Sequence, residues 1–245
     1  MSDWSPDQLP FDKQGFCGVA RLFPLPDLVL FPNVVQTLHI FEERYRAMME
    51  DALATDQLIG MALYEPGWET DYAGRPPLSP VACLGRVMTH HRFADGRFNL
   101  MLLGVQRVRI VEEVHPPQAF RRAKVELIAE QSPPDADAVA KRLTAELQSR
   151  LRSAPLAPDH LQEVLSRELP LSVLTDLLGF ALPLSSEEKR SMLADANPVS
   201  RAELLLKAIG QGLLGDTPAD PASKDKAKPG DPGEGVWSPP QFSVN

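Results

Sequence analysis

Residues 82–113 read ACLGRVMTHHRFADGRFNLMLLGVQRVRIVEE, and the fold of this chain depends on the pattern in them. Asp95-Gly96 separates two apolar runs, and these two residue types tolerate the positive φ that a tight strand reversal requires. The run RVRIV, residues 107–111, then alternates with the period of a strand. This places Val108 and Ile110 on one face, with both arginines and Val111 on the other. The stretch therefore predicts antiparallel strands joined by a hairpin.

Further strand-like runs surround this hairpin from about Ala20 to Glu130, and Gly, Pro or Asp separates them. One helix interrupts them, because EERYRAMMEDALATD carries apolar residues at helical spacing. Hairpins without regular crossover helices favour a closed or sandwiched antiparallel sheet over a doubly wound one. The predicted strands are QTLHIF, LIGMALY, ACLGRVMTHHRF, RFNLMLL, VQRVRIVEE and RAKVELIAE.

The stretch LFPLPDLVLFPNV, residues 22–34, is apolar but contains three prolines. Proline lacks a backbone N–H and cannot continue a helix or an inner strand. We therefore expect a short edge-type strand around Phe23 to Leu25, which Pro24 and Pro26 keep from extending. An apolar turn that Pro32 ends should follow.

The region from Asp135 to about Gly212 predicts a helical bundle. DADAVAKRLTAELQSRLRS has leucine or valine every four residues, and Ser185 to Glu188 form a capping box that opens another helix. Asn197-Pro198 is a helix N-cap followed by proline at the first helical position. The residues that follow have the composition of a disordered tail, although its VWSPPQF segment is more apolar.

Composition and charge exclude several classes of protein. The net charge of −8 disfavours non-specific binding to nucleic acid, although residues 81–126 hold eight basic and four acidic residues. Cys17 and Cys83 lie outside any metal-ligand spacing and are expected to be reduced thiols. The start lacks the apolar core of a signal peptide, and no 18 consecutive apolar residues occur. The cytoplasm is the expected location.

Short matches to catalytic motifs occur, but their surroundings in the sequence do not fit those motifs. Residues 210–215 match G-x-G-x-x-G but follow a helix instead of a strand, and Ser186 to Lys189 match S-x-x-K but are explained by the helix cap. His90 and His91 are adjacent, so on a strand they point to opposite faces and cannot share a metal ion. No phosphate-binding loop is present. The sequence therefore predicts a binding protein, with no enzymatic activity and no cofactor.

Several segments, taken in order, resemble the amino-terminal substrate-binding domain of the Lon protease family. The resemblance runs from about Arg21 to Gly212, and LGVQR at residues 103–107 is among its more specific parts. It implies an α+β fold in which a PUA-like antiparallel β-barrel with one inserted helix precedes a helical bundle and a disordered C-terminal tail. The segments are LFPLPDLVLFPN, FEERYRAMMEDAL, CLGRV, DGRFNLMLLGVQRVRI and NPVSRAELLLKAI.

The resemblance also divides the chain and suggests a function. We expect a flexible segment at 1–19, the β domain at 20–131, the bundle at 132–212 and the tail at 213–245. The ATPase and protease modules of Lon would lie downstream, so the chain is expected to be a stand-alone form. Its partners would be unfolded polypeptides or partner proteins, with an ATPase or protease possible in trans. Neither membrane nor nucleic-acid partners are expected.

Peptide capture needs exposed apolar surface and aromatic anchors. The loop EPGWETDYAGRPPLSP offers two aromatic residues without the periodicity that would bury them, although a loop aromatic can equally pack onto the barrel. Two phenylalanines are weaker candidates, because core packing accounts for both. The predicted peptide-binding residues are Trp68, Tyr72, Phe31 and Phe93.

Two alternatives remain open. One is an RNA-binding PUA-like module that uses Arg86, Arg92, Arg97, Arg107 and Arg109 of the basic stretch. The other is a small-molecule hydrolase with Ser186 as its nucleophile. The sequence does not define the bound proteins, the oligomeric state or the role of the tail.

Overall fold

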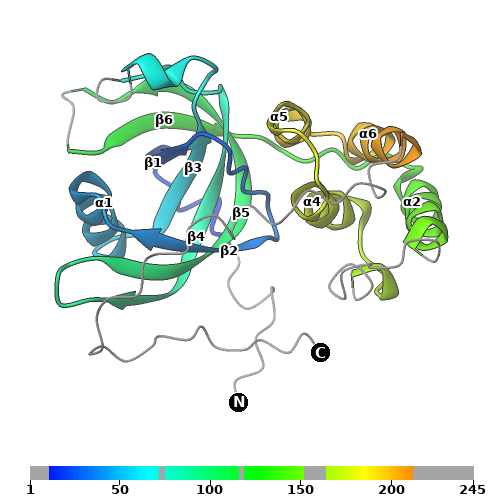
Figure 1. Cartoon of the computed structure of the whole chain (residues 1–245), viewed down its shortest axis with the longest axis horizontal. Helices are drawn as coiled ribbons and strands as arrows, with labels where there is room; N and C mark the ends of the chain where they lie inside the picture. The colour runs from blue at the N-terminus through cyan, green and yellow to red at the C-terminus, as the bar shows by residue number, and fades with distance from the viewer. Residues whose placement is uncertain (1–10, 72–74, 116–118, 152–163, 212–245) are drawn as a thin grey trace.

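The structure is a computed structural model that describes residues 11–71, 75–115, 119–151 and 164–211. Figure 1 shows the strands curling into a barrel, with α1 beside it, a short helical turn above it, and α2, α4, α5 and α6 gathered on the other side. The predicted α+β fold, with a PUA-like barrel, one inserted helix and a helical bundle, is confirmed. The predicted tail and its VWSPPQF segment lie outside the described residues.

Six strands of the described chain form one sheet in the order β2-β5-β4-β3-β1-β6. An additional pairing between β5 and β6 closes the barrel, so that β2 alone has a single neighbour. The strands are β1 (Val19–Leu25), β2 (Val35–Ile40), β3 (Leu58–Leu63), β4 (Val81–Arg92), β5 (Phe98–Glu113) and β6 (Arg121–Leu127).

The predicted hairpin is present between β4 and β5. Gly96 has a φ of 86°, and the Phe93 N–H donates to the Arg97 carbonyl at 2.9 Å. The division of β5 into two strands at Gly104 was wrong, because β5 is continuous through this glycine. A Cβ on Gly104 would lie 2.0 Å from the carbonyl oxygen of Phe31. The glycine therefore permits a close backbone approach and does not break the strand.

The first strand is longer and more central than predicted. β1 starts at Val19 and lies between β3 and β6, so it is not an edge strand. Its pairing with β3 is parallel, whereas every other strand pairing of the described sheet is antiparallel. β6 pairs with residues 19–22 only, so Pro24 lies where β1 no longer has a neighbour on that side.

The predicted helices form where their signals lie. α1 buries Tyr45, Met48, Met49 and Ala52, and the Ser185–Glu188 capping box is present at the start of α5. The side chain of Asn197 caps α6 by accepting a hydrogen bond from the Val199 N–H at 2.9 Å. The helices are α1 (Glu43–Leu53), the 3₁₀ helix η2 (Trp68–Asp71), α2 (Ala136–Leu151), α4 (Leu171–Ala181), α5 (Ser186–Ala194) and α6 (Pro198–Gly210).

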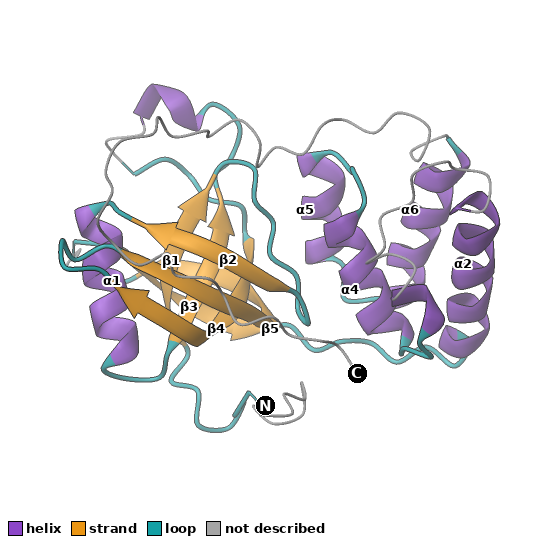
Figure 2. Ribbon diagram, turned by 60° about the horizontal axis from the view of Figure 1, so that its bottom comes forward, coloured by secondary structure: helices purple, strands orange, loops and turns teal. Residues whose placement is uncertain are grey.

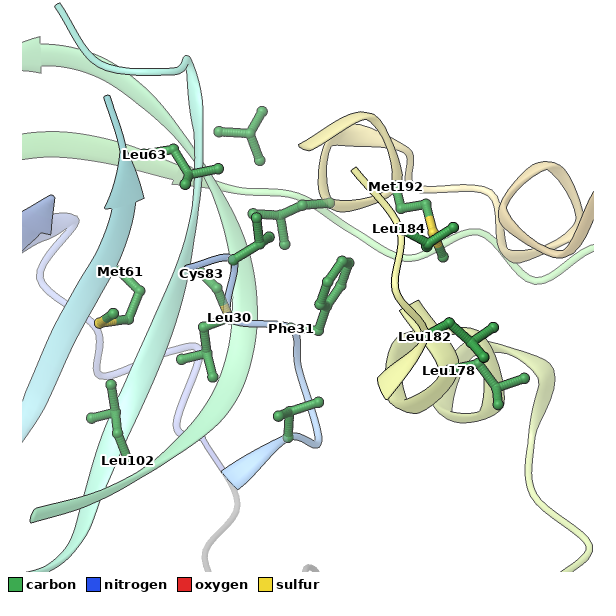
Figure 3. Close-up of a cluster of buried hydrophobic side chains, with 14 of the residues drawn as sticks. Leu30, Phe31, Met61, Leu63, Cys83, Leu102, Leu178, Leu182, Leu184 and Met192 are labelled. Carbon is green, nitrogen blue, oxygen red and sulfur yellow. The ribbon is translucent and has the colours of Figure 1, made fainter. Parts of the chain in front are cut away.

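One hydrophobic cluster joins the barrel to the bundle. Phe31 is fully buried within it and lies between barrel side chains on one side and helical side chains on the other (Figure 3). A second cluster takes residues from β1, β3, β4, β5 and β6. The division between residues 131 and 132 stays a prediction, since the larger cluster extends across it. The neighbours of Phe31 on the bundle side in Figure 3 are Leu178 of α4, Leu182 and Leu184 of the connection between α4 and α5, and Met192 of α5.

Buried charges also connect the barrel to the bundle. The guanidinium of Arg107 on β5 forms a bidentate ion pair with Asp176 of α4, and its Nε donates to the Leu193 carbonyl at 3.2 Å. Arg201 of α6 donates to Glu130 at 2.5 Å, and Glu130 also accepts from Arg107 at 3.2 Å. The guanidinium of Arg201 also lies 3.6 Å from Asp176, so the two buried arginines share one buried carboxylate and the more exposed Glu130. Because the set is neutral, each buried side chain depends on the others.

We expect Asp176→Ala to lower the free energy of unfolding by about 3–5 kcal/mol, because it leaves two buried guanidinium groups without their shared carboxylate. Urea denaturation followed by circular dichroism measures the change. Glu146→Ala is the matched control, since it removes a carboxylate that pairs with Arg150 on the exposed surface of α2. That change should cost about 0.5 kcal/mol or less. Equal losses in both variants would contradict the role of the network.

The two cysteines should differ in reactivity. Burial raises the pKa of the Cys83 thiol to about 12, whereas Cys17 is exposed. Since the thiolate is the reactive form, iodoacetamide at pH 8 should alkylate Cys17 in the folded protein and reach Cys83 only after denaturation. Mass spectrometry of the intact protein counts the adducts. Two rapid adducts without denaturant would show that the Cys83 environment is open.

Candidate functional site

Strand β2 is the open side of the sheet. In the described part of the chain it pairs only with β5, whereas the other strands have neighbours on both sides. Alternate residues of an edge strand direct their N–H and C=O groups away from the sheet. Proteins usually protect such edges with charged residues or proline, but the β2 sequence VQTLHI contains neither. β2 is therefore the candidate site for pairing with a further strand.

An aromatic and histidine cluster lies beside this edge. His39 of β2 and His91 of β4 both lie opposite Asn99 of β5, which places them on one face of the sheet. The Phe93 ring centroid lies 4.8 Å from that of His91 and 6.2 Å from that of His39. His39 also stacks on Phe41 at 6.1 Å, and its Nδ1 is hydrogen-bonded to Asn99 Oδ1 at 2.6 Å.

We call Val35, His39, Phe41, His91 and Phe93 the edge patch. Phe41 is 61% exposed and Val35 is 37% exposed. They are two of the three large exposed hydrophobic side chains in the described residues, and the third is Val111 at 54%. The apolar exposure of the described surface is therefore concentrated along β2.

Ion pairs hold the hairpin beside the edge patch in place. Arg46 of α1 donates to the Asp95 carbonyl at 2.8 Å, and Arg92 pairs with Glu50 of the same helix at 2.6 Å. The Arg97 N–H donates to the Asp95 carboxylate at 3.0 Å, which helps to hold the pKa of that carboxyl below its ordinary value. The guanidinium of Arg97 lies 5.6 Å from the centroid of the Phe93 ring. These contacts fix the β4–β5 hairpin, which carries Phe93, against α1.

The four predicted peptide-binding residues do not gather in one place. Phe93 belongs to the edge patch, but Phe31 has no exposed surface, and we remove it because it packs between barrel and bundle. Trp68 stacks on Tyr64 at 5.2 Å and is only partly exposed, as expected for a loop aromatic that packs onto the barrel. Its helix η2 lies across the barrel from the β4–β5 hairpin (Figure 1). Tyr72 lies outside the described residues.

The basic stretch does not form a free cationic surface, so the prediction of an RNA interface lacks support. Arg107 is buried in the ion-pair network, and Arg92 and Arg97 pair with acidic side chains at 2.6 Å and 2.5 Å. Arg109 is exposed and Arg86 is partly buried, and no ion pair involves either within the described ranges. Strand periodicity alone could not show that Arg107 faces a buried carboxylate 69 residues away.

The sequence interpretation missed His39 and Phe41. A signal was present, because QTLHIF alternates polar and apolar residues and then ends on a second consecutive apolar residue, Phe41. The predicted opposite directions of His90 and His91 are confirmed, since they pair with Leu100 and Asn99 on alternate faces. Ser186 begins α5, and the Lys189 amine donates to the Phe180 carbonyl at 3.0 Å instead of to Ser186.

The described residues contain neither a metal-binding cluster nor a membrane-spanning helix. Among the side chains placed by the structure, no three or more His, Cys, Asp or Glu residues gather in a way that could hold a metal ion. Every helix within the described ranges falls short of the length and apolarity needed to cross a bilayer.

The family of this chain follows from comparison with known proteins. The family model described as the ATP-dependent protease La (LON) substrate-binding domain matches residues 19–211. The chain belongs to this family, which confirms the resemblance read from the sequence. No comparison supports the RNA-binding alternative.

Curated relatives include the Lon protease of Anaeromyxobacter dehalogenans, 24% identical over 206 residues that cover 82% of this chain and 24% of that protein. Lon protease 2 of Desulfotalea psychrophila is 29% identical over 201 residues, which cover 78% of this chain and 25% of that protein. The chain thus spans about a quarter of the length of these relatives.

Solved structures support the fold. A Lon N-terminal domain protein from Xanthomonas campestris aligns with a TM-score of 0.55 and 23% identity, covering 77% of this chain and 97% of that one. The N-terminal domain of a Mycobacterium avium complex Lon protease gives a TM-score of 0.61 and 18% identity, with coverages of 77% and 96%.

Replacement of the buried Phe31 and of the exposed Phe41 should differ in its effect on the free energy of unfolding. Phe31→Ala should lower the free energy of unfolding by about 3–5 kcal/mol, because it opens a cavity between barrel and bundle. Phe41→Ala should change it by about 0.5 kcal/mol or less, because that ring is largely in water. Thermal and urea unfolding of both variants measure the difference. A large loss in Phe41→Ala would mean that this ring supports the fold, and a small loss in Phe31→Ala would contradict its burial.

Proposed function

We propose that this protein recognises extended, unfolded polypeptide or an extended segment of a partner protein, without catalysing a reaction on it. The observation that carries the proposal is that β2 carries no charged side chain and has a strand neighbour on one side only within the described residues, with the exposed Phe41 directly after its end. The family description as a substrate-binding domain supports it. The bound polypeptide would add to the sheet as a strand beside β2.

Strand addition matches the chemistry of unfolded polypeptide. The bound backbone would supply N–H and C=O groups to those that β2 directs outward, and these groups are the same in every sequence. An edge strand therefore gives affinity with little sequence preference. Such a site suits a protein that must recognise many unrelated chains.

The edge patch would supply the anchors. Aromatic side chains contribute much of the energy of protein interfaces, because they bury a large apolar area with few rotatable bonds. Phe41 presents its ring to solvent, and the rings of His91 at the end of β4 and of Phe93 directly after it lie in contact with each other, with Phe93 also beside His39. Apolar side chains of a bound strand would pack on these rings, since directly opposed residues share one face of a sheet.

The relatives named Lon protease suggest where bound polypeptide would go. We propose that this chain presents it to an ATPase or a protease, which acts as a separate partner or as a further part of the same assembly. The basic stretch would take no part, because Arg107 is buried in the ion-pair network and Arg92 and Arg97 pair with acidic side chains at the surface.

Phe41→Ala should weaken binding of unfolded polypeptide about tenfold or more, as expected when an interface loses an aromatic anchor. Fluorescence anisotropy with fluorescein-labelled β-casein, a chain without stable tertiary structure, measures the affinity. Val35→Lys should weaken binding as well, because a lysine on an edge strand opposes strand addition. Binding of β-casein by the unmodified protein should persist at high salt, because salt retains apolar contacts but weakens ion pairs of the kind that basic side chains form with nucleic-acid phosphates.

Val111→Ala is the matched control, because it removes a comparably exposed apolar side chain from another part of the barrel. It should leave the affinity for β-casein within about twofold. Loss of binding in Trp68→Ala but not in Phe41→Ala would move the site to η2 and contradict the edge proposal. If the protein binds a single-stranded RNA oligonucleotide in a salt-sensitive way and has no affinity for β-casein, its ligand is RNA and the polypeptide proposal is wrong.

A further inference from the structure

We propose that residues 241–245 of this chain, QFSVN, add as a strand to the free side of β2 and compete there with bound polypeptide. The inference rests on the function proposed above, because it concerns the same edge. Residues 241–245 lie outside the described part of the chain. The proposed docking is therefore argued from their sequence and from the geometry of β2. Occupation of the edge by the protein itself would also protect a strand that carries no protection of its own.

The sequence of this segment has the period of a strand. Phe242 and Val244 alternate with Gln241, Ser243 and Asn245, which is the pattern of a half-buried strand. Pro239 and Pro240 come directly before it and lack the N–H groups that a longer strand would need. The strand is therefore expected to begin after the prolines.

The two surfaces are compatible in charge and shape. Neither QFSVN nor the β2 sequence VQTLHI contains a charged side chain, so no charge is buried or opposed when they pair. The phenylalanine and valine of the segment would lie on one face of the added strand. On that face β2 presents Phe41 and His39, and their rings offer an apolar area for packing.

A short repeat in the sequence supports docking on the barrel. The pattern Trp-Ser-Pro-x-Gln occurs at residues 4–8 and again at 237–241. The first copy lies outside the described residues, but Phe11, which follows it, packs against the hydrophobic cluster of the barrel strands and lies 5.6 Å from Phe16. Phe11 lies three residues after the first copy, and Phe242 directly follows the second. The cluster that Phe11 contacts lies on β1, β3, β4, β5 and β6, so the repeat supports docking on the barrel, and the choice of β2 rests on its free edge.

The connection is long enough to reach β2. Residues 212–240 lie between the end of the described chain and the segment. A flexible chain of this length has an end-to-end distance of about 30 Å and can extend to roughly 100 Å, which exceeds the size of a small barrel. A tether of this kind gives an effective concentration of about 1 mM. A segment with a local dissociation constant of about 0.1 mM would then occupy β2 roughly nine-tenths of the time.

The test compares two double variants of the full chain. Phe242→Asp with Val244→Asp places charges on the face predicted to pack on the edge patch. Gln241→Asp with Ser243→Asp adds the same charge on the opposite face and is the matched control. Amide hydrogen exchange of residues 35–40 reports occupation of β2 directly, and fluorescein-labelled β-casein reports whether the edge is available to a ligand.

In the first variant we expect amides of β2 to exchange about tenfold faster and β-casein to bind about tenfold more tightly. The control should stay within about twofold of the unmodified protein in both measurements. Unchanged exchange and affinity in the first variant, with normal β-casein binding, would overturn the docking and leave the proposed function intact. Faster exchange without β-casein binding by any variant would support the docking and overturn the proposed function.

A second copy of the chain could supply the strand instead. Protection of β2 would then rise with protein concentration, and sedimentation would show a dimer that the first variant loses. That result would overturn docking within one chain. Protection that is independent of concentration, in a protein that sediments as a monomer, supports it.

Discussion

The structure depends on a buried cation in the middle of its longest strand. Arg107 on β5 meets Asp176 of α4 in a bidentate ion pair, and Glu130 links it to Arg201 of α6. A guanidinium that is 2% exposed is stable only if its partners lie within hydrogen-bonding distance. The helical bundle must therefore dock on the barrel in one register, which is also the register that encloses Phe31.

The same strand determines the candidate binding surface. β5 pairs with β4 through its residues 98–109, with β6 through residues 108–113 and with β2 through residues 98–103. Because β6 and β1 complete the barrel, β2 is left outside the closed ring with one free side. Figure 2 shows the strands and the bundle helices on opposite sides of the molecule, and Phe31 and the Arg107 ion pair connect the two parts. Anchoring of β5 on the bundle and of the hairpin on α1 keeps the edge rigid, which lowers the entropy cost of binding an extended chain.

An open edge that is suited to unfolded chains is also a hazard, because it can pair with any exposed strand. Under the proposed function, this edge has to be available to ligands and also protected from aggregation. Reversible occupation by a weak internal strand would satisfy both requirements, since a bound polypeptide with higher affinity would displace it. The family description as a substrate-binding domain and the edge geometry thus support the same proposal, which is that the protein holds unfolded polypeptide at β2.

The sequence by itself determined the family, the order of strands and helices, the hairpin at Asp95-Gly96 and the helix caps, because each depends on residues close together in the chain. It could not show that Gly104 admits the Phe31 carbonyl, that Arg107 is an internal ion partner, or that Phe31 is enclosed while Phe41 is exposed. Only the tertiary structure decided these points and assembled the edge patch. Burial and strand pairing join residues far apart in sequence, and local periodicity carries no information about which distant partner each side chain meets.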